Sequence, residues 1–474
     1  MKKNDERIGV VEALGSNGEG IIKDDGTVIF VPFVLVGEKI RYKVLKVTKK
    51  CSYGKVLEVI TPAENRVRPE CSVFGKCGGC QLQHLRYSNQ LKMKEENISD
   101  CFKKIANLAV NVLPTIKGDN KFRYRNKLQL PVVDLNNETV IGFYAENSHR
   151  VVPIEDCLIN AYWTKDVILA FKHYIKEFNI KGYNELNNSG ELREIVVKDV
   201  KGKLIITAVV LDENLRGLNR LVELIEHQVK LPFSLYINFN NSATNVIYGK
   251  KFKHVYGPKD YMAEMHGIKY KIGVQSFMQV NDTVCSKLYA QVRELIDADD
   301  ETTVIDAYSG AGLMTAILAK NAKKAIGVEI IAEAVELANE LATKNNLEGK
   351  IINYQGKCEV IIPDIIKKER INNSKISLVL DPPRKGCDIE VIKAIIDCDI
   401  DKIVYVSCKP SSLARDVGLL VGSLEVVDGE IKKVENPKHR YNVQIVKPFD
   451  MFSQTKHVET LVLLCRKNLD KSEF

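Results

Sequence analysis

The sequence predicts an α/β protein of three parts: an N-terminal β-barrel, a central α+β domain and a C-terminal doubly wound parallel sheet. Its 474 residues exceed one ordinary domain and suggest about three. The chain begins with short strand-like runs between glycine-rich turns, which is typical of a small barrel. After Asp300, apolar strands alternate with amphipathic helices, which is typical of a doubly wound sheet. We therefore expect domains at residues 1–61, 62–270 and 271–474.

The expected barrel carries many basic residues. Between Lys39 and Lys55 seven lysine and arginine side chains are interleaved with Tyr42 and Tyr53. This composition is typical of a nucleic-acid-binding face, although a solvated basic strand explains it equally well. The formal net charge of +8 likewise favours a polyanionic partner.

Composition also bears on the compartment. No run of eighteen or more apolar residues occurs, and the start of the chain lacks the apolar stretch of a secretion signal. We therefore expect a cytoplasmic protein that does not enter a membrane. Twelve cysteines in a reducing compartment indicate metal binding, redox chemistry or a nucleophile rather than a disulfide framework.

The central part is expected to be mixed. A helix-like stretch at about 87–106 could pack on the C-terminal domain, and a basic and aromatic cluster follows at residues 121–127. Strand-like runs at 195–198 and 204–210 precede a second helix near 218–226. The cluster at 121–127 is suited to holding RNA, and an ordinary amphipathic strand explains it almost as well.

A nucleoside-binding turn is expected after the first strand of the C-terminal part. That strand ends at Asp306 and leads into a turn with Gly310 and Gly312, which let the backbone approach a ligand closely. Glu329 closes the next strand, where a carboxylate can accept hydrogen bonds from both ribose hydroxyls. Thr315 stands where a dinucleotide fingerprint has its third glycine, which disfavours a nicotinamide or flavin cofactor.

Two later strands of this part also end in reactive groups. One ends in Asp381-Pro382-Pro383-Arg384, and another places Cys408 on a loop at the same edge of the sheet. A strand-end cysteine is more often a small core residue, but a thiolate is also a soft and reversible nucleophile. Such a nucleophile could add to carbon 6 of uracil and so make carbon 5 reactive toward a methyl donor. Glu459, at the entrance of the last strand, could then remove the carbon 5 proton.

Three ordered motifs, at residues 381–386, 406–416 and 450–459, resemble the signatures of the RNA 5-methyluridine (uracil-5) methyltransferases, which are class I enzymes dependent on S-adenosylmethionine. The resemblance implies that Cys408 is the nucleophile, Glu459 the base, and Asp381 a residue between cofactor and uracil. It further implies contacts to S-adenosylmethionine from residues of four segments, Gln279, Tyr308, Glu329 and Asp381. Lys409 departs from the family, which commonly has Asn there; a cation beside the thiol would favour the thiolate.

A cluster of cysteines forms a separate candidate metal site. Its members share a glycine-rich loop, with one more distant candidate for a fourth ligand: Cys71, Cys77, Cys80 and Cys157. Composition leaves zinc and an iron–sulfur cluster equally open. The resemblance favours iron, because members of the family with an N-terminal TRAM barrel use this spacing to bind a [4Fe–4S] cluster.

The resemblance therefore implies a TRAM RNA-binding barrel at residues 1–61, a central α+β domain with an iron–sulfur site, and a Rossmann-like methyltransferase domain. It favours 23S ribosomal RNA as the substrate and 5-methyluridine as the product, because members that act on transfer RNA commonly lack the barrel and the cysteine loop. A transfer RNA enzyme and a noncatalytic RNA-binding iron–sulfur protein remain alternatives. No obligate protein partner is evident from the sequence.

Overall fold

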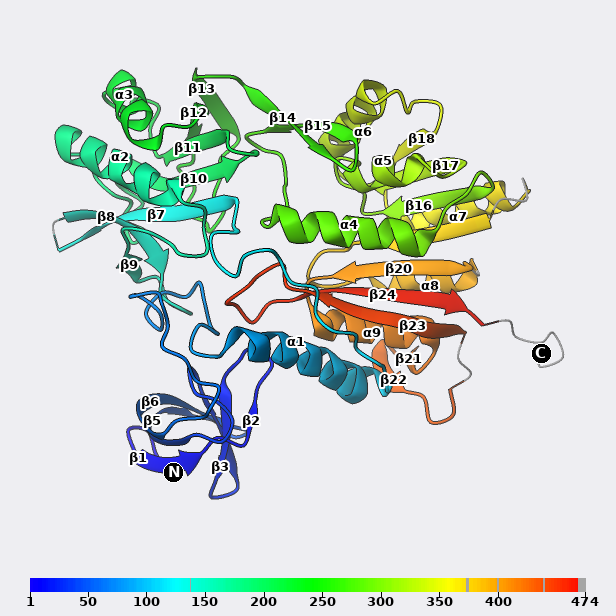
Figure 1. Ribbon diagram of the computed structural model, residues 1–474, viewed down its shortest axis with the longest axis horizontal. Coiled ribbons are helices and arrows are strands. Elements are labelled where there is room, and N and C mark those ends of the chain that lie inside the picture. The colour runs from blue at the N-terminus through cyan, green and yellow to red at the C-terminus, as the bar shows by residue number, and fades with distance from the viewer. Residues whose placement is uncertain (137, 372–374, 399, 438–439, 468–474) are drawn as a thin grey trace.

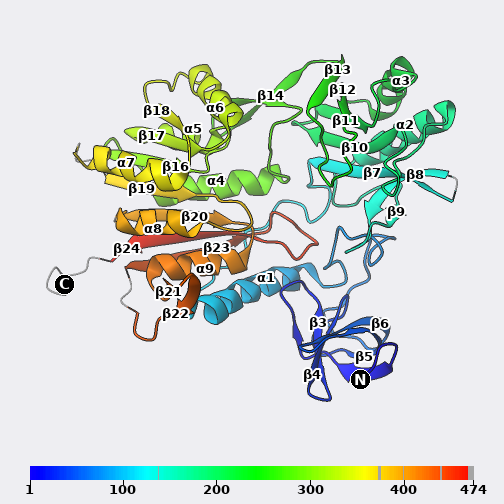
Figure 2. The same cartoon turned by 180° about the vertical axis from the view of Figure 1, so that it is seen from behind.

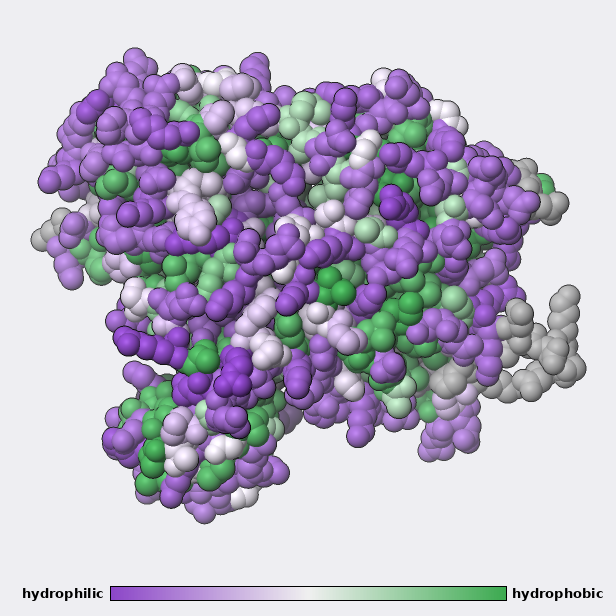
Figure 3. Space-filling model, in the orientation of Figure 1, coloured by the Kyte–Doolittle hydropathy of each residue, from purple (hydrophilic) through white to green (hydrophobic). Residues whose placement is uncertain are grey.

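The computed structural model describes residues 1–136, 138–371, 375–398, 400–437 and 440–467. An N-terminal lobe, a central domain and a C-terminal domain are arranged around a long helix, and both views show this arrangement (Figures 1 and 2). In the space-filling view the N-terminal lobe projects from the body, and the visible face is mostly hydrophilic with scattered apolar groups (Figure 3). Among the helices of the described part, none combines the length and apolar character needed to cross a bilayer.

The N-terminal lobe is a six-stranded sheet with the order β1-β5-β6-β4-β3-β2. Its strands are β1 (Glu6–Val10), β2 (Ala13–Leu14), β3 (Gly20–Asp24), β4 (Thr27–Val31), β5 (Lys39–Val47) and β6 (Ser52–Thr61). Along β5, Ile40, Tyr42 and Val44 alternate with more exposed residues and point into the apolar core, as the two-residue period of a strand requires. The expected small barrel is thus confirmed as an N-terminal β domain.

A helix connects this lobe to the C-terminal domain. It consists of α1 (Tyr87–Cys101) and a π-helical turn η1 (Phe102–Ala106), which ends at Asn107 in the left-handed conformation. Ile98, Phe102 and Ala106 are buried in the core that α9 (Pro410–Val421) shares with the C-terminal sheet. The helix near residues 87–106 therefore belongs, by its packing, to the C-terminal domain.

The central domain is a seven-stranded sheet with the order β13-β12-β11-β10-β7-β8-β9, in which β11 and β12 are parallel. Its strands are β7 (Lys127–Leu135), β8 (Glu138–Tyr144), β9 (Val151–Pro153), β10 (Leu192–Asp199), β11 (Leu204–Val210), β12 (Phe233–Phe239) and β13 (Lys251–Tyr256). Helices α2 (Trp163–Phe178) and α3 (Leu218–Val229) cover one face, and a hairpin of β14 (Asp260–Met265) and β15 (Ile268–Gly273) packs on the other. Because both faces are covered, β11 is buried along its whole length, which explains why Thr207 is its one polar residue.

The C-terminal domain is a doubly wound sheet with the order β18-β17-β16-β19-β20-β24-β23. Its main strands are β16 (Thr302–Ala307), β17 (Lys324–Glu329), β18 (Ile351–Gln355), β19 (Lys375–Leu380), β20 (Lys402–Ser407), β23 (Tyr441–Phe449) and β24 (Glu459–Arg466). The first five are parallel, whereas β24 and β23 add two antiparallel strands at one edge. A small hairpin of β21 (Leu424–Val427) and β22 (Glu430–Lys433) follows α9.

Helices cover both faces of this sheet. On one face lie α4 (Asp282–Ile296), α5 (Leu313–Ala319) and α6 (Ala332–Lys344), and on the other α7 (Cys358–Ile371), α8 (Ile389–Asp397) and α9. Helix α9 has Pro410 in its first turn, where no backbone donor is needed, and ends at Gly422 with φ +91°. The expected Rossmann-like domain is confirmed, and the carboxyl ends of its parallel strands meet at one edge of the sheet.

Candidate active site and cysteine cavity

A cavity of about 760 Å³ opens at the carboxyl edge of the C-terminal sheet. Five residues proposed from the sequence line it, and they come from four separate motifs and a preceding loop: Gln279, Tyr308, Asp381, Cys408 and Glu459. The parallel strands β16, β19 and β20 deliver the middle three, because open sheets of this kind place their ligands at the carboxyl ends of the strands. The cavity thus joins segments that are up to 180 residues apart in the chain, from Gln279 to Glu459.

The turn after β16 forms one wall of the cavity. Tyr308 and Gly310 both adopt positive φ, and Gly312 does so at +79°, where an added Cβ would lie 2.8 Å from Ala338. The Gly310 amide donates to the Glu329 carboxylate at 3.0 Å. Glu329 also accepts the amides of Ile330 and Ile331. Within the described part of the chain Glu329 does not line the cavity, so it shapes the turn rather than facing the cavity.

Thr315 has a structural task that the sequence did not reveal. Its hydroxyl donates to the carboxylate of Asp306 at 2.6 Å, and both side chains are buried. Burial raises the pKa of Asp306 to about 7, and the charge of Asp381 adds to this effect. A glycine at position 315 would leave this carboxylate without its partner.

Two further carboxyl groups belong to the same acidic interior. The Asp381 side chain is exposed to the cavity, but the surrounding protein atoms reduce its solvation by water. This desolvation raises the pKa of Asp381 to about 7. Glu459 is 3% exposed, and both burial and the charge of Asp381 raise its pKa well above the usual value. Because like charges in a poorly solvated space disfavour ionisation, this pair binds protons more tightly than isolated carboxylates do. A cation placed in the cavity would therefore be electrostatically stabilised.

The Cys408 thiol lies within the influence of three charged groups. Burial first, and then the carboxylates Glu459 and Asp381, raise its pKa, whereas a hydrogen bond and the charge of Arg384 lower it. Lys409 is exposed and does not line the cavity. The cation that favours the thiolate is thus Arg384, a role that its place in the 381–386 motif does not reveal.

Helix α9 holds the loop that carries Arg384. Ser412 donates to the Arg384 carbonyl at 2.9 Å, and Arg415 donates to two further carbonyls of the loop. Asp416 is fully buried and accepts the Cys387 amide and the Tyr405 hydroxyl. The two motifs at 381–386 and 406–416 are therefore one hydrogen-bonded unit.

The segment that carries Gln279 is held by the central domain. Asn126 donates to the Gln279 carbonyl at 2.9 Å and to Asp282 at 2.8 Å. The buried Lys198 ammonium donates to the carbonyls of Val274 and Ser276 at 2.6 and 2.5 Å. These contacts fix the orientation of the central domain next to the cavity.

A second cavity, of about 790 Å³, lies beside the first. All four proposed cysteine ligands line it, and three of them come from the loop before α1: Cys71, Cys77, Cys80 and Cys157. The two cavities share wall residues, namely Arg125, Lys127, Arg384 and Phe452. The cysteine loop and the candidate active site are therefore neighbours in space.

The cysteines influence one another electrostatically. Burial, with a smaller contribution from the other thiols, raises the pKa of Cys77 to about 11 and that of Cys80 to about 12. Arg123 binds Asp156 through both terminal nitrogens and so orders the chain at Cys157. Among the residues that the structure describes, however, no three His, Cys, Asp or Glu side chains are grouped closely enough to hold a metal ion.

Some side chains of the basic and aromatic cluster at 121–127 form contacts within the protein. Arg123 serves the Cys157 loop, and the Tyr124 hydroxyl donates to the Ser453 carbonyl at 3.0 Å. Arg125 and Lys127 are the members of the cluster that line both cavities. Sequence reasoning treated these side chains alike, since it has no access to the direction in which each one points.

Comparison with known proteins gives consistent matches. A family model described as tRNA (Uracil-5-)-methyltransferase matches residues 237–467, and the TRAM domain model matches residues 10–57. An uncharacterized RNA methyltransferase of Clostridium acetobutylicum is 37% identical, with 99% of each chain covered. Another, from Halalkalibacterium halodurans, is 36% identical and covers 99% of this chain and 98% of its own.

The fold also matches a solved structure. The crystal structure of Pyrococcus abyssi tRNA (uracil-54, C5)-methyltransferase in complex with S-adenosyl-L-homocysteine covers 97% of this chain and 100% of its own, with a TM-score of 0.74. Its sequence is 24% identical, so the similarity establishes the fold alone.

Proposed function

The chain belongs to the RNA uracil-5-methyltransferase family and carries a TRAM domain, and from that membership we propose that it methylates carbon 5 of a uridine in 23S ribosomal RNA, using S-adenosylmethionine. The observation that carries the proposal is the single cavity lined by a thiol, a buried glutamate and a strand-end aspartate: Cys408, Glu459 and Asp381. The product is 5-methyluridine.

The electrostatics of the cavity suit a cationic cofactor. S-adenosylmethionine, when bound, supplies an electrophilic methyl group on a positively charged sulfur. Asp381 and Asp306 both line the cavity, and burial raises the pKa of each, with a further contribution from the charge of Asp381 at Asp306; a positive charge there favours their ionised forms. We assign Gln279, Tyr308 and Asp381 to cofactor contact, with Glu329 acting at the turn of Gly310.

Cys408 is the proposed nucleophile. A uridine within folded RNA must leave its stack to enter the cavity. The thiolate then forms a bond to carbon 6, and the displaced electron pair makes carbon 5 nucleophilic toward the methyl group. Arg384 favours the thiolate, which offsets part of the effect of burial on the Cys408 pKa.

Glu459 is the proposed general base. After methyl transfer, carbon 5 still carries its proton, and a carboxylate that has a raised pKa is a stronger base once ionised. Removal of that proton by Glu459 restores the double bond between carbons 5 and 6 and expels the Cys408 thiolate. The cycle therefore ends with the free Cys408 thiolate and a protonated glutamate that returns its proton to water.

We further propose that the cysteine cavity holds a [4Fe–4S] cluster. Four thiols line one cavity, and the Gly79 amide donates to the Cys77 sulfur at 3.3 Å, a contact that suits a thiolate ligand. Zinc is the rival, since four cysteines also make a closed tetrahedral zinc site. The cluster would supply no step of the polar reaction described above; its ligands line the neighbouring cavity, which shares wall residues with the active site.

Replacement of a single ligand tests this metal assignment. Anaerobically purified protein is expected to absorb in the visible region through iron–sulfur charge transfer, and Cys77→Ser should remove most of that band. Cys51→Ser, which changes a thiol of the N-terminal lobe outside the cavity, should leave the spectrum unchanged. A colourless wild-type protein that contains zinc would refute the iron assignment.

The choice of RNA rests on the architecture. The barrel and the cysteine loop together favour ribosomal RNA by resemblance to family members that carry both. A transfer RNA uridine is the second candidate, because a solved enzyme named for tRNA matches the fold over 97% of this chain. The three-part fold is thus compatible with either substrate.

A direct assay separates the two RNAs. Purified protein with labelled methyl donor is expected to incorporate methyl groups into 23S RNA from a strain that lacks the gene, and the tRNA from the same strain should stay at background. Mapping of 5-methyluridine in that strain should show one or more uridines of 23S RNA unmodified. Methylation of the tRNA alone would refute 23S RNA as the substrate and favour a transfer RNA uridine.

A further inference from the structure

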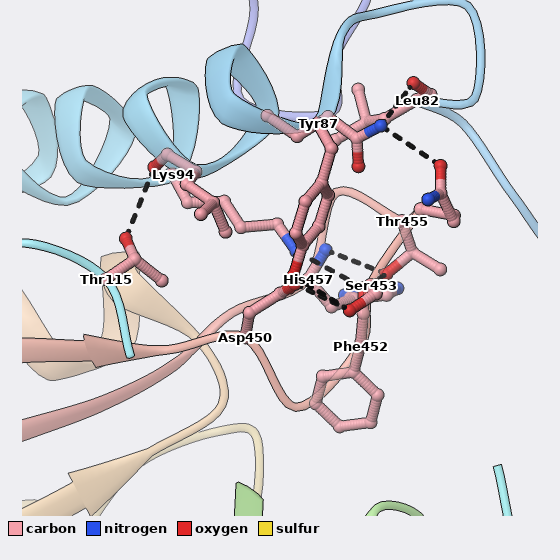
Figure 4. Close-up of polar contacts among 12 residues, drawn as sticks. Leu82, Tyr87, Lys94, Thr115, Asp450, Phe452, Ser453, Thr455 and His457 are labelled. Atoms are coloured by element: carbon pink, nitrogen blue, oxygen red, sulfur yellow. Dashed lines mark hydrogen bonds and ion pairs between the residues drawn. The ribbon is translucent and has the colours of Figure 1, made fainter. Parts of the chain in front are cut away.

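The proposed base lies at the end of a turn that α1 holds in place. Phe449 of β23 pairs with Glu459 of β24, and the residues between them form a long turn. This turn, residues 450–458, contributes Phe452 to the wall of the active-site cavity and to the wall of the cysteine cavity. Figure 4 shows α1 above the turn, with side chains from both meeting at Asp450. The position of Glu459 therefore depends on how this turn is fixed.

The first residue of the turn, Asp450, is fully buried and binds a lysine of α1. The Lys94 ammonium, 1% exposed, lies 2.5 Å from one Asp450 oxygen and donates to the Phe452 carbonyl at 3.2 Å. The other Asp450 oxygen accepts the hydroxyls of Tyr87 at 2.7 Å and Ser453 at 2.6 Å. Both ends of this ion pair are thus hydrogen-bonded to the turn or to the helix.

A second contact fixes the middle of the turn. Gln454 has a φ of +69°, and its carbonyl accepts the amides of Gln81 and Leu82 at 3.2 and 3.0 Å. Gln90 of α1 donates to the Gln454 side chain at 3.0 Å. The chain before α1 and the helix itself therefore bind the turn at several points, which lie 356 to 373 residues away in sequence.

A buried ion pair contributes little net stability to a fold, because desolvation offsets the attraction between the charges. Removing two charges from water costs several kcal/mol per ion, so well-packed apolar residues would stabilise this contact as well or better. Charged hydrogen bonds do impose direction and distance, and they specify one geometry where apolar packing tolerates several. The Lys94–Asp450 pair is therefore suited to holding a catalytic segment in a fixed position.

We propose that Lys94 is a positioning residue for the proposed base: its ion pair with Asp450 fixes the 450–458 turn and so places Glu459 where it can reach the carbon 5 proton. This inference rests on the role of Glu459 in the proposed function. In this proposal α1 supports the last chemical step, the removal of the carbon 5 proton. Cys408 and Asp381 lie outside the turn, at the ends of β20 and β19, so we expect attack by Cys408 and methyl transfer to be retained.

The Lys94→Met variant tests the proposal, since methionine has a similar length without charge. We expect turnover to fall by about 10²-fold, the scale of a misplaced catalytic group, while RNA binding is retained. The methylated RNA should remain attached to Cys408 as a complex that survives denaturation, as in Glu459→Gln. Lys324→Met removes a comparable lysine from its ion pair with the buried Glu369, far from the cavity, and should show no such complex.

A second variant separates positioning from stability. Lys94→Met leaves Asp450 unpaired and can unfold the protein, whereas the double variant Lys94→Met/Asp450→Asn removes both charges and should recover the melting temperature. We expect the double variant still to accumulate the complex. Wild-type turnover by the double variant, or slow turnover of Lys94→Met without the complex, would overturn the proposal.

Glu459→Gln serves as the internal reference. If Glu459→Gln accumulates the complex and the folded Lys94 variants do not, the inference about Lys94 fails and the proposed function stands. If Glu459→Gln also turns over without accumulation, Glu459 is not the base, and both the proposed role of Glu459 and the inference fail together.

Discussion

Cys408→Ala is expected to lose all methyl transfer, because Cys408 is the proposed nucleophile that forms the temporary bond to carbon 6, and the other thiol that lines the cavity, Cys285, is buried. Without that bond, carbon 5 of uracil is too weak a nucleophile to accept the methyl group. The variant should also fail to form a covalent complex with RNA that contains 5-fluorouridine. Wild-type protein should be trapped by such RNA, because the fluorine at carbon 5 cannot leave as a proton does. Gel electrophoresis under denaturing conditions measures both results.

Cys465→Ala is the matched control for this experiment. Cys465 is a half-buried thiol on β24 that lies outside the active-site cavity, so its replacement should leave methylation and trapping intact. Trapping of Cys408→Ala to the wild-type extent would refute the nucleophile assignment. Absence of trapping in the wild type as well would favour a noncatalytic RNA-binding protein.

Glu459→Gln is expected to slow turnover by about 10²- to 10⁴-fold, the usual contribution of a general base. Glutamine is nearly isosteric with glutamate, so the cavity should keep its shape while it loses the proton acceptor. Methyl transfer itself should proceed in the first turnover, since it precedes proton removal. The variant should therefore accumulate Cys408 bonded to methylated uridine in unsubstituted RNA.

Rapid-quench measurement of label in the protein–RNA complex tests this expectation. The control is Glu369→Gln, which changes another buried glutamate, one that pairs with Lys324 and lies outside the cavity. If the Glu369→Gln variant is folded, it should turn over at the wild-type rate. Rapid release of methylated RNA by Glu459→Gln would assign the proton removal to a different group.

Local pattern was sufficient to predict several elements of the fold. The apolar alternation after Asp300 corresponds to β16, β17, β19 and β20, and the helical stretch near 87–106 corresponds to α1 and η1. These elements follow from hydrophobic period and from punctuation by glycine and proline, which are properties of neighbouring residues. Strand order does not follow in this way. The insertion of the antiparallel β24 between β20 and β23 depends on pairing between distant segments.

The same distinction between local pattern and long-range contact applies to the candidate site. Motifs were sufficient to propose Cys408, Asp381 and Glu459, because the functional group of a side chain limits the reactions in which it can take part. The roles of Arg384 and Lys94 do not follow from any motif. Their tasks depend on a neighbour 24 residues away in one case and 356 in the other. Only a folded chain brings Arg384 to the thiol and Lys94 to Asp450.

From the sequence alone follow the candidate reactive groups and the strand ends at which they lie, since side-chain reactivity and local periodicity are encoded residue by residue. The tertiary structure decided which charges meet, which carboxylates are buried and which helix fixes the turn before the base. Electrostatic energy depends on distance and on solvent exposure, and both are set by packing between segments far apart in the chain. That is why a candidate nucleophile could be proposed from the sequence, whereas the contacts around it could not.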